Sequence, residues 1–283
     1  MQLLRLLVVA LGIGWCVGAQ AQPVAMVTDL VGKAQLQGDA KNPNVSILAE
    51  IDADRQVRLD KGAKLVAIYL KSGYEYSFGG PALVQFKSDA PVSLSGSAPQ
   101  QRVPALTKDS QIRIKPVGMV QGALVMRSAP MGARLKLLGP NGSKVLEMSP
   151  LFRWRGIENV NSYQFELTDD TGRTLLETAV EGTTMKLPPQ VVLKEGVSYT
   201  WEISARIADG RKYSSAGDFA VVAADLRARV ELLRPKKDSP LSERVAFAAW
   251  LEQMELKEEA RKYWKDIAAE RPDDARIKEL AAQ

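Results

Sequence analysis

The chain has 283 residues, of which 46% are hydrophobic and 25% are charged, and its formal net charge is +5. This balance is that of folded globular protein, with room for two or three domains, and it excludes a largely disordered chain. Lysine and arginine are scattered among acidic residues without a long basic run, which argues against nucleic acid as a partner.

The first 21 residues have the features of a leader for export. Arg5 is their only charge, an apolar run follows from residue 6 to 17, and Ala19-Gln20-Ala21 has the form of a cleavage site. The run is shorter than the roughly 20 residues that span a bilayer, so an uncleaved membrane anchor is a less favoured alternative to a cleaved signal peptide. We predict a signal peptide at 1–21, a mature chain that begins at Gln22, and a periplasmic or secreted product without a later transmembrane segment.

Residues 22–128 predict a β-rich domain, because short alternating runs are separated by glycine turns. The run at 65–70 is followed by a Ser72-Gly73 turn and a second run at 74–78, which is the pattern of a hairpin. In the second run Tyr74, Tyr76 and Phe78 share one strand face, either as core or as a binding surface.

The turns and strand ends of this first region resemble those of FecR domains. The segments that carry the resemblance are 31–32, 55–59, 62–65, 70–73 and 78–82. FecR-like regulators of sigma factors are inner-membrane proteins with a cytoplasmic helical segment, whereas this chain has a cleavable leader. The resemblance therefore implies an exported β-rich module, with a periplasmic signalling role as an alternative.

Residues 135–223 predict a β-sandwich of six or seven short strands, since alternating runs are separated by turns such as Pro140-Asn141-Gly142. In the run at 198–207, Tyr199, Trp201 and Ile203 alternate with polar residues. One face of that strand is expected to lie in a core and the other in water. The alternative is that its rings, with Trp154 and Tyr163, line a binding groove.

The second region resembles a fibronectin type III domain. Trp154 is followed nine residues later by Tyr163, and Phe219 closes the last strand. The spacing Leu193, Gly196, Tyr199 resembles a tyrosine corner, which implies a buried ring whose hydroxyl bonds a nearby backbone group. The resemblance specifies a fold and not a ligand.

Residues 225–283 are rich in alanine, leucine and charged residues and predict a helical tail. Ser239-Pro240 is a helix start, and a second helix over 257–270 ends before Pro272. Ala260, Trp264 and Pro272 resemble a tetratricopeptide hairpin, although the glycine usual between its helices is replaced near Glu255. One such hairpin cannot bury its apolar face alone. Either flanking helices at 226–233 and 275–282 cover it, or it leaves an open groove for a partner.

Catalytic chemistry has few candidates in this sequence. There is no histidine, and the only cysteine is Cys16 in the predicted leader. This excludes Ser-His-Asp arrangements and thiolate nucleophiles in the mature chain. Carboxylate pairs remain at 52/54, 169/170 and 273/274, where a calcium site or a carboxylate-only glycan hydrolase is the alternative to plain turn and helix-start acids.

These observations predict a mainly β protein with a C-terminal α segment, without enzymatic activity, metal or cofactor. Its expected role is that of an exported binding or scaffold protein of the cell envelope. An envelope protein and peptidoglycan are both open as partners. The candidate interaction surface is Trp250, Tyr263 and Trp264, whose alternative place is the core between helices.

Overall fold

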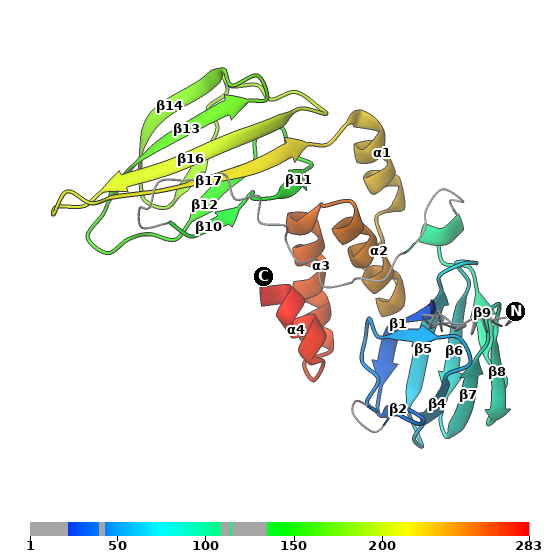
Figure 1. Ribbon diagram of the computed structural model, residues 1–283. Helices are drawn as coiled ribbons and strands as arrows, with labels where there is room; N and C mark the ends of the chain where they lie inside the picture. Colours follow the sequence, from blue (N-terminus) through cyan, green and yellow to red (C-terminus); the bar gives the residue numbers. More distant parts are fainter. Residues whose placement is uncertain (1–21, 40–42, 109–113, 115–134, 283) are drawn as a thin grey trace, which may run out of the picture.

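The computed structural model describes residues 22–39, 43–108, 114 and 135–282 (Figure 1). The predicted leader lies outside the described residues. Within them the chain is mainly β with four helices at its C-terminal end, which confirms the predicted fold class. The parts are an N-terminal β domain, a β-sandwich and a helical segment.

The N-terminal β domain contains nine described strands and one short 3-10 helix. Their bounds are β1 Pro23–Val31, β2 Ala34–Leu36, β3 Glu50–Asp52, β4 Gln56–Leu59, β5 Lys64–Tyr69, β6 Glu75–Gly79, β7 Ala82–Phe86, β8 Pro91–Ser95, β9 Gln100–Arg102 and η1 Leu106–Lys108. One sheet has the order β3-β1-β5-β6-β9, and the other has the order β2-β4-β7-β8. The predicted hairpin at 65–78 corresponds to β5 and β6, which pair antiparallel.

The first of these sheets is covered on both faces. Ala25 and Val27 of β1 belong to the domain's own core, whereas Met26 between them belongs to a second core shared with the helices. Ile68, which pairs with Met26 across the sheet, lies in that second core as well. Because successive side chains of a strand point to opposite faces, the uninterrupted apolar run of β5 follows from this double burial.

The three aromatic residues of β6 and its preceding turn divide between core and surface. Tyr76 and Phe78 are buried, and Phe78 packs against Phe86 with ring centroids 5.8 Å apart. Tyr74 precedes the strand and is 39% exposed. The core interpretation therefore holds for Tyr76 and Phe78 and not for Tyr74.

The β-sandwich is built from eight described strands in two sheets. Their bounds are β10 Leu137–Gly139, β11 Ser143–Val145, β12 Leu151–Trp154, β13 Ser162–Asp169, β14 Thr174–Glu181, β15 Thr184–Lys186, β16 Ser198–Arg206 and β17 Lys212–Val221. The three-stranded sheet has the order β10-β12-β15, and the five-stranded sheet has the order β11-β17-β16-β13-β14.

Aromatic rings fill the space between the two sheets. Trp201 on β16 is fully buried, and its ring centroid lies 5.3 Å from that of Phe152 and 6.0 Å from that of Phe165. Its indole Nε1 donates a 2.7 Å hydrogen bond to the carbonyl oxygen of Pro140. The rings of the run at 198–207 therefore form core and not a ligand platform.

The predicted tyrosine corner is present. Tyr199 is buried, and its hydroxyl accepts a 2.7 Å hydrogen bond from the backbone N–H of Lys194. The ring stacks on Phe219 of β17 with centroids 5.5 Å apart. The bond holds the loop before β16 against the strand, as the spacing of Leu193, Gly196 and Tyr199 predicts.

The helical segment has four helices: α1 Ala224–Leu233, α2 Leu241–Gln253, α3 Lys257–Glu270 and α4 Ala275–Ala282. α1 and α4 are the flanking helices that the sequence predicts. The predicted helix start at Ser239-Pro240 corresponds to α2, in which Pro240 occupies the N-cap position and no side chain makes a capping bond. Glu255 has a φ of 63° in the turn before α3, where glycine is usual because it lacks a Cβ.

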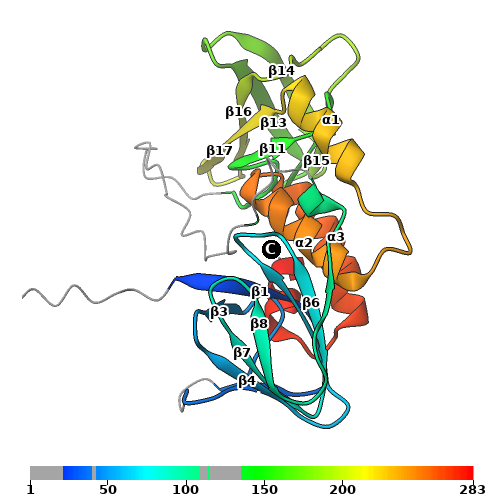
Figure 2. The same cartoon turned by 90° about the vertical axis from the view of Figure 1, so that its right-hand side faces the viewer.

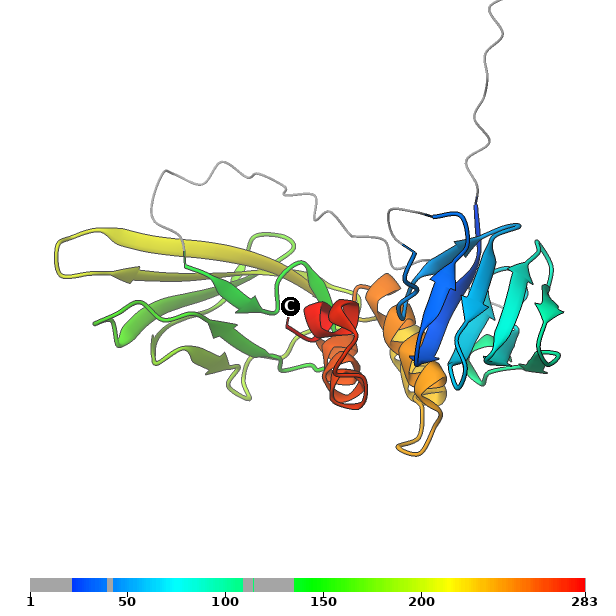
Figure 3. The ribbon, with the colours of Figure 1, turned by 90° about the horizontal axis from the view of Figure 1, so that it is seen from below.

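The helical segment lies between the two β domains although it comes last in sequence (Figures 1 and 3). Figure 2 shows the same order in a perpendicular view, with the sandwich above, the helices in the middle and the N-terminal β domain below. A single apolar core joins Met26, Ile47 and Ile68 of the N-terminal domain to Phe247 and Trp250 of α2. The helices are therefore not a free tail, because the N-terminal domain covers part of their apolar surface.

Polar contacts at this junction bring together residues far apart in sequence. Nε and Nη2 of Arg271 donate to Oδ1 of Asp29 at 3.1 and 2.8 Å. Oδ1 of Asp274 accepts the N–H of Ile277 at the start of α4, and its Oδ2 accepts the N–H of Ile47 at 2.9 Å. Asp274 is thus the predicted helix-start acid, and it also bonds the N-terminal domain.

A third contact is centred on Arg102 at the end of β9. Its guanidinium donates to Oε1 of Glu243 at 2.6 Å and to Oγ of Ser242 at 3.0 Å, both on α2, and it also bonds the buried Glu75 of β6. Buried and partly buried charges of this kind are costly unless paired. The Arg102 cluster therefore favours one orientation of α2 on the N-terminal domain.

Candidate functional site

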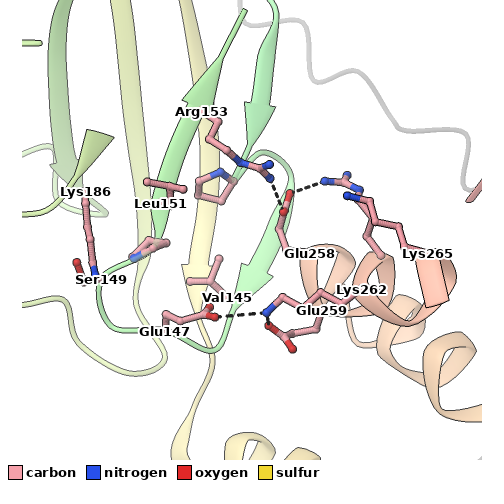
Figure 4. A pocket seen from close by; sticks show the side chains of 13 residues that line it. Val145, Glu147, Ser149, Leu151, Arg153, Lys186, Glu258, Glu259, Lys262 and Lys265 are labelled. Atoms are coloured by element: carbon pink, nitrogen blue, oxygen red, sulfur yellow. Dashed lines mark hydrogen bonds and ion pairs between the residues drawn. The ribbon is translucent and has the colours of Figure 1, made fainter. Parts of the chain in front are cut away.

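A groove of about 480 Å³ lies where the helical segment meets the sandwich (Figure 4). One wall is the outer face of the β10-β12-β15 sheet, and the other is α3. This volume is in the range of sites that bind small ligands or short chain segments. Both walls are rich in charged side chains.

The sandwich wall is set by the alternation of β12. Phe152 and Trp154 point into the core, so Leu151 and Arg153, which alternate with them, point outward to the groove. Lys186 of β15 is the cross-strand neighbour of Leu151 and is exposed beside it. This strand pair therefore presents an apolar side chain next to cations.

The helix wall is one face of α3. Glu258, Arg261, Lys262 and Lys265 are spaced by three, one and three residues, which places them on the same side of an α-helix. Trp264 and the rest of the apolar stripe lie on the opposite side, in the core. α3 thus separates a core face from a charged face that lines the groove.

Ion pairs connect the two walls. Glu258 accepts a 2.8 Å bond from Nη2 of Arg153 across the groove and a 3.0 Å bond from Arg261 on its own helix. Lys262 bonds Glu259 and lies 3.7 Å from Glu147 of the sandwich. Partial burial lowers the pKa of Lys262, but the hydrogen bond and charge of Glu259 outweigh it and raise the pKa overall. This ammonium therefore stays charged in ordinary conditions.

Close approach at Gly139 makes room for the central carboxylate. A Cβ at this position would lie 2.5 Å from Oε1 of Glu258, and φ of Gly139 is +146°, which side chains rarely adopt. Next to it, the backbone N–H of Lys144 donates to the carbonyl oxygen of Glu255 at 2.7 Å, and Lys257 Nζ donates to the carbonyl oxygen of Gly142. These bonds fix the positions of the two groove walls relative to each other.

Two lysines of the groove are left without an acidic partner. The described lining has five basic and three acidic side chains, and each of these three carboxylates is paired with at least one cation. Among the described residues, neither Lys186 nor Lys265 has a carboxylate within ion-pair distance. The groove therefore carries an excess of positive charge, with one unpaired ammonium on each wall.

The floor of the groove is apolar. Val145 and Pro150 line it and are buried, and Leu151 is 49% exposed at its side. No aromatic ring is present among the described lining residues. A ligand would meet aliphatic surface below and cations at both sides.

The sequence-predicted interaction surface lies elsewhere and is not open. Trp250 is 3% exposed and Trp264 is fully buried, with its Nε1 donating to Oε1 of Glu252 at 3.1 Å. Tyr263 is half-buried, and its ring is 5.1 Å from that of Phe247. These three residues pack between helices and against the shared core, so they present no continuous surface to a partner.

The carboxylate pairs proposed as catalytic or metal candidates have structural partners. Asp54 pairs with Lys87 at 2.9 Å, and Oδ1 of Asp169 accepts the backbone N–H of Thr171 and of Arg173 within its turn. The hydrogen bond from the Thr171 hydroxyl is the largest cause that lowers the pKa of Asp169, and the two backbone bonds lower it further. In the described part of the chain, no cluster of three or more His, Cys, Asp or Glu residues is arranged to hold a metal ion.

Comparisons with known proteins add little to this description. No family model matches the chain, and no curated protein matches it. Among solved structures, CopC from Methylosinus trichosporium OB3b is similar at 22% identity over 32% of this chain and 95% of that chain, with a TM-score of 0.25. At this score the likeness carries no conclusion. Within the described residues, no helix has the length and apolar character needed to cross a membrane.

Proposed function

We propose that this chain is an exported, non-enzymatic binding or scaffold protein of the cell envelope. In this proposal the helical segment holds a FecR-like N-terminal domain and a fibronectin type III-like sandwich in one fixed arrangement. The observation that carries it is the groove whose two walls come from the sandwich and from α3. Such a site depends on the docked helices and presents a formed surface to a ligand.

Three further observations support parts of the proposal. The Arg5 leader with Ala19-Gln20-Ala21 supports export. The Tyr199 hydrogen bond supports the fibronectin-like assignment. The carboxylates of the groove are held by cations such as Arg153 and Lys262, which favours binding over acid–base catalysis.

Site-specific photo-crosslinking of the full chain in its native envelope tests the binding role. A photoreactive amino acid in place of Leu151 lies at the groove, and the same residue in place of Val92, which is 47% exposed on the distant β8, is the matched control. We expect an envelope component to be captured from position 151 and not from position 92. N-terminal sequencing of the same material should begin at Gln22.

Two results would contradict the proposal. Equal crosslinking from both positions would show that the groove has no special role. A chain that keeps Met1 and stays in the cytoplasmic fraction would contradict export to the envelope.

A further inference from the structure

The unpaired lysines of the groove indicate the charge of the ligand that it binds. Lys186 is on the sandwich wall and Lys265 is on the helix wall, and both side chains are exposed (Figure 4). The neighbouring carboxylates already have cationic partners, as Glu258 has in Arg153 and Arg261. An anionic ligand would therefore gain two ion pairs without breaking any that are present.

The shape and composition of the lining favour a peptide over a sugar. The aliphatic floor at Val145, Pro150 and Leu151 suits a branched apolar side chain, and the described lining offers no ring on which a sugar could stack. β15 is the last strand in the order β10-β12-β15, and its Lys186 lines the groove.

From these features we infer that the groove binds an acidic segment of a partner protein. Carboxylates of that segment would pair with Lys186 and Lys265, and an apolar side chain between them would rest on Leu151. This inference rests on the proposed binding function and specifies its ligand.

Fluorescence anisotropy with the full chain and a labelled peptide of alternating glutamate and leucine tests the inference. A peptide with glutamine in place of glutamate is the matched probe. We expect the glutamate peptide to bind more tightly, and its affinity to fall as salt is raised to about 0.5 M, because exposed charges are screened.

Charge reversal of both lysines should abolish this preference. For the double variant Lys186→Glu/Lys265→Glu we expect a loss of affinity of about tenfold or more, since like charges would then face the peptide. Lys212→Glu, at an exposed lysine at the start of β17 in the same domain, should change the affinity by less than about twofold. Both groove lysines are exposed, so circular dichroism should show an unchanged fold.

The outcomes separate this inference from the proposed function. Equal binding of the glutamate and glutamine peptides, or full binding by the double variant, would overturn the acidic-segment inference. Should the peptides fail while purified peptidoglycan sediments with the native chain and not with the double variant, cell-wall carboxylates would be the ligand. The binding role would then stand and the inference would be wrong. Failure to capture any envelope component from position 151 in the native envelope would instead contradict the binding role itself.

Discussion

Trp201→Ala is expected to destabilise the sandwich more than any surface change on the same strand. The indole is fully buried among Phe152, Phe165 and Trp154, and truncating a core aromatic costs about 3–5 kcal/mol. The change also leaves the carbonyl oxygen of Pro140 without its donor, for which about 1–3 kcal/mol is typical when the group stays buried. We therefore expect a total loss of about 4–8 kcal/mol, a large share of the stability of an ordinary domain.

Urea unfolding of the full chain, followed by circular dichroism, measures this loss, and hydrogen exchange over 135–223 locates it in the sandwich. Trp201→Phe keeps most of the ring and should lose about 1–3 kcal/mol, chiefly from the missing bond to Pro140. Ser204→Ala on the opposite face of β16 should stay within about 0.5 kcal/mol. A loss below about 1 kcal/mol for Trp201→Ala would refute the core interpretation, because a buried indole cannot be removed so cheaply.

Three further predictions concern other parts of the molecule. A double-mutant cycle on Asp29 and Arg271 should give a coupling free energy of about 1–2 kcal/mol, because the pair is partly buried and doubly hydrogen-bonded; a coupling near zero would show that it does not help to hold the helices. Tyr199→Phe should cost about 1 kcal/mol in urea unfolding through loss of the corner hydrogen bond, and no change would mean that the bond is not made in solution. Burial raises the pKa of Glu252 above 4.5 in the folded state, although the hydrogen bond from Trp264 has a smaller opposing effect. The contribution of this carboxyl group to stability is therefore present at low pH and is lost as pH rises through the folded pKa. Glu252→Gln, which keeps an acceptor oxygen, should therefore raise the unfolding midpoint at neutral pH and not below pH 4.5, and an equal gain at both pH values would contradict this reasoning.

Strand periodicity predicts much of the sandwich. Tyr199, Trp201 and Ile203 alternate with polar residues, and the same alternation places them in the core. The tyrosine corner is also readable, because its residues lie close together in sequence and form a local bond. Local patterns succeed here because the sandwich buries one face of each strand against its own second sheet.

The docking of the helical segment could not be predicted in the same way. A helix stripe shows that one face is buried, but it does not identify the surface that covers it. Asp274 has the appearance of an ordinary helix-start acid, and its bond to Ile47 joins positions 227 residues apart. The uninterrupted apolar run at 65–70 was the available signal, since a strand covered on both faces loses its alternation.

The groove was missed for a related reason. Glu258, Arg261, Lys262 and Lys265 have the spacing of one helix face, but a charged face is usually exposed to solvent, and its spacing alone does not indicate a site. Its other wall, at Leu151 and Lys186, lies far away in the sequence. Only the three-dimensional arrangement shows that these charges face one another.

The central position of the helices has a consequence for how the chain folds during synthesis. Ribosomes deliver the N-terminal β domain first, so the face that carries Met26 and Ile68 stays uncovered until the helices emerge. A nascent chain at that stage exposes apolar surface, to which chaperones bind. Asp274, just before α4, bonds Ile47, and Ile277 of α4 lies in the shared core, so cleavage before residue 274 would remove two of the contacts that hold the helical segment on the N-terminal domain.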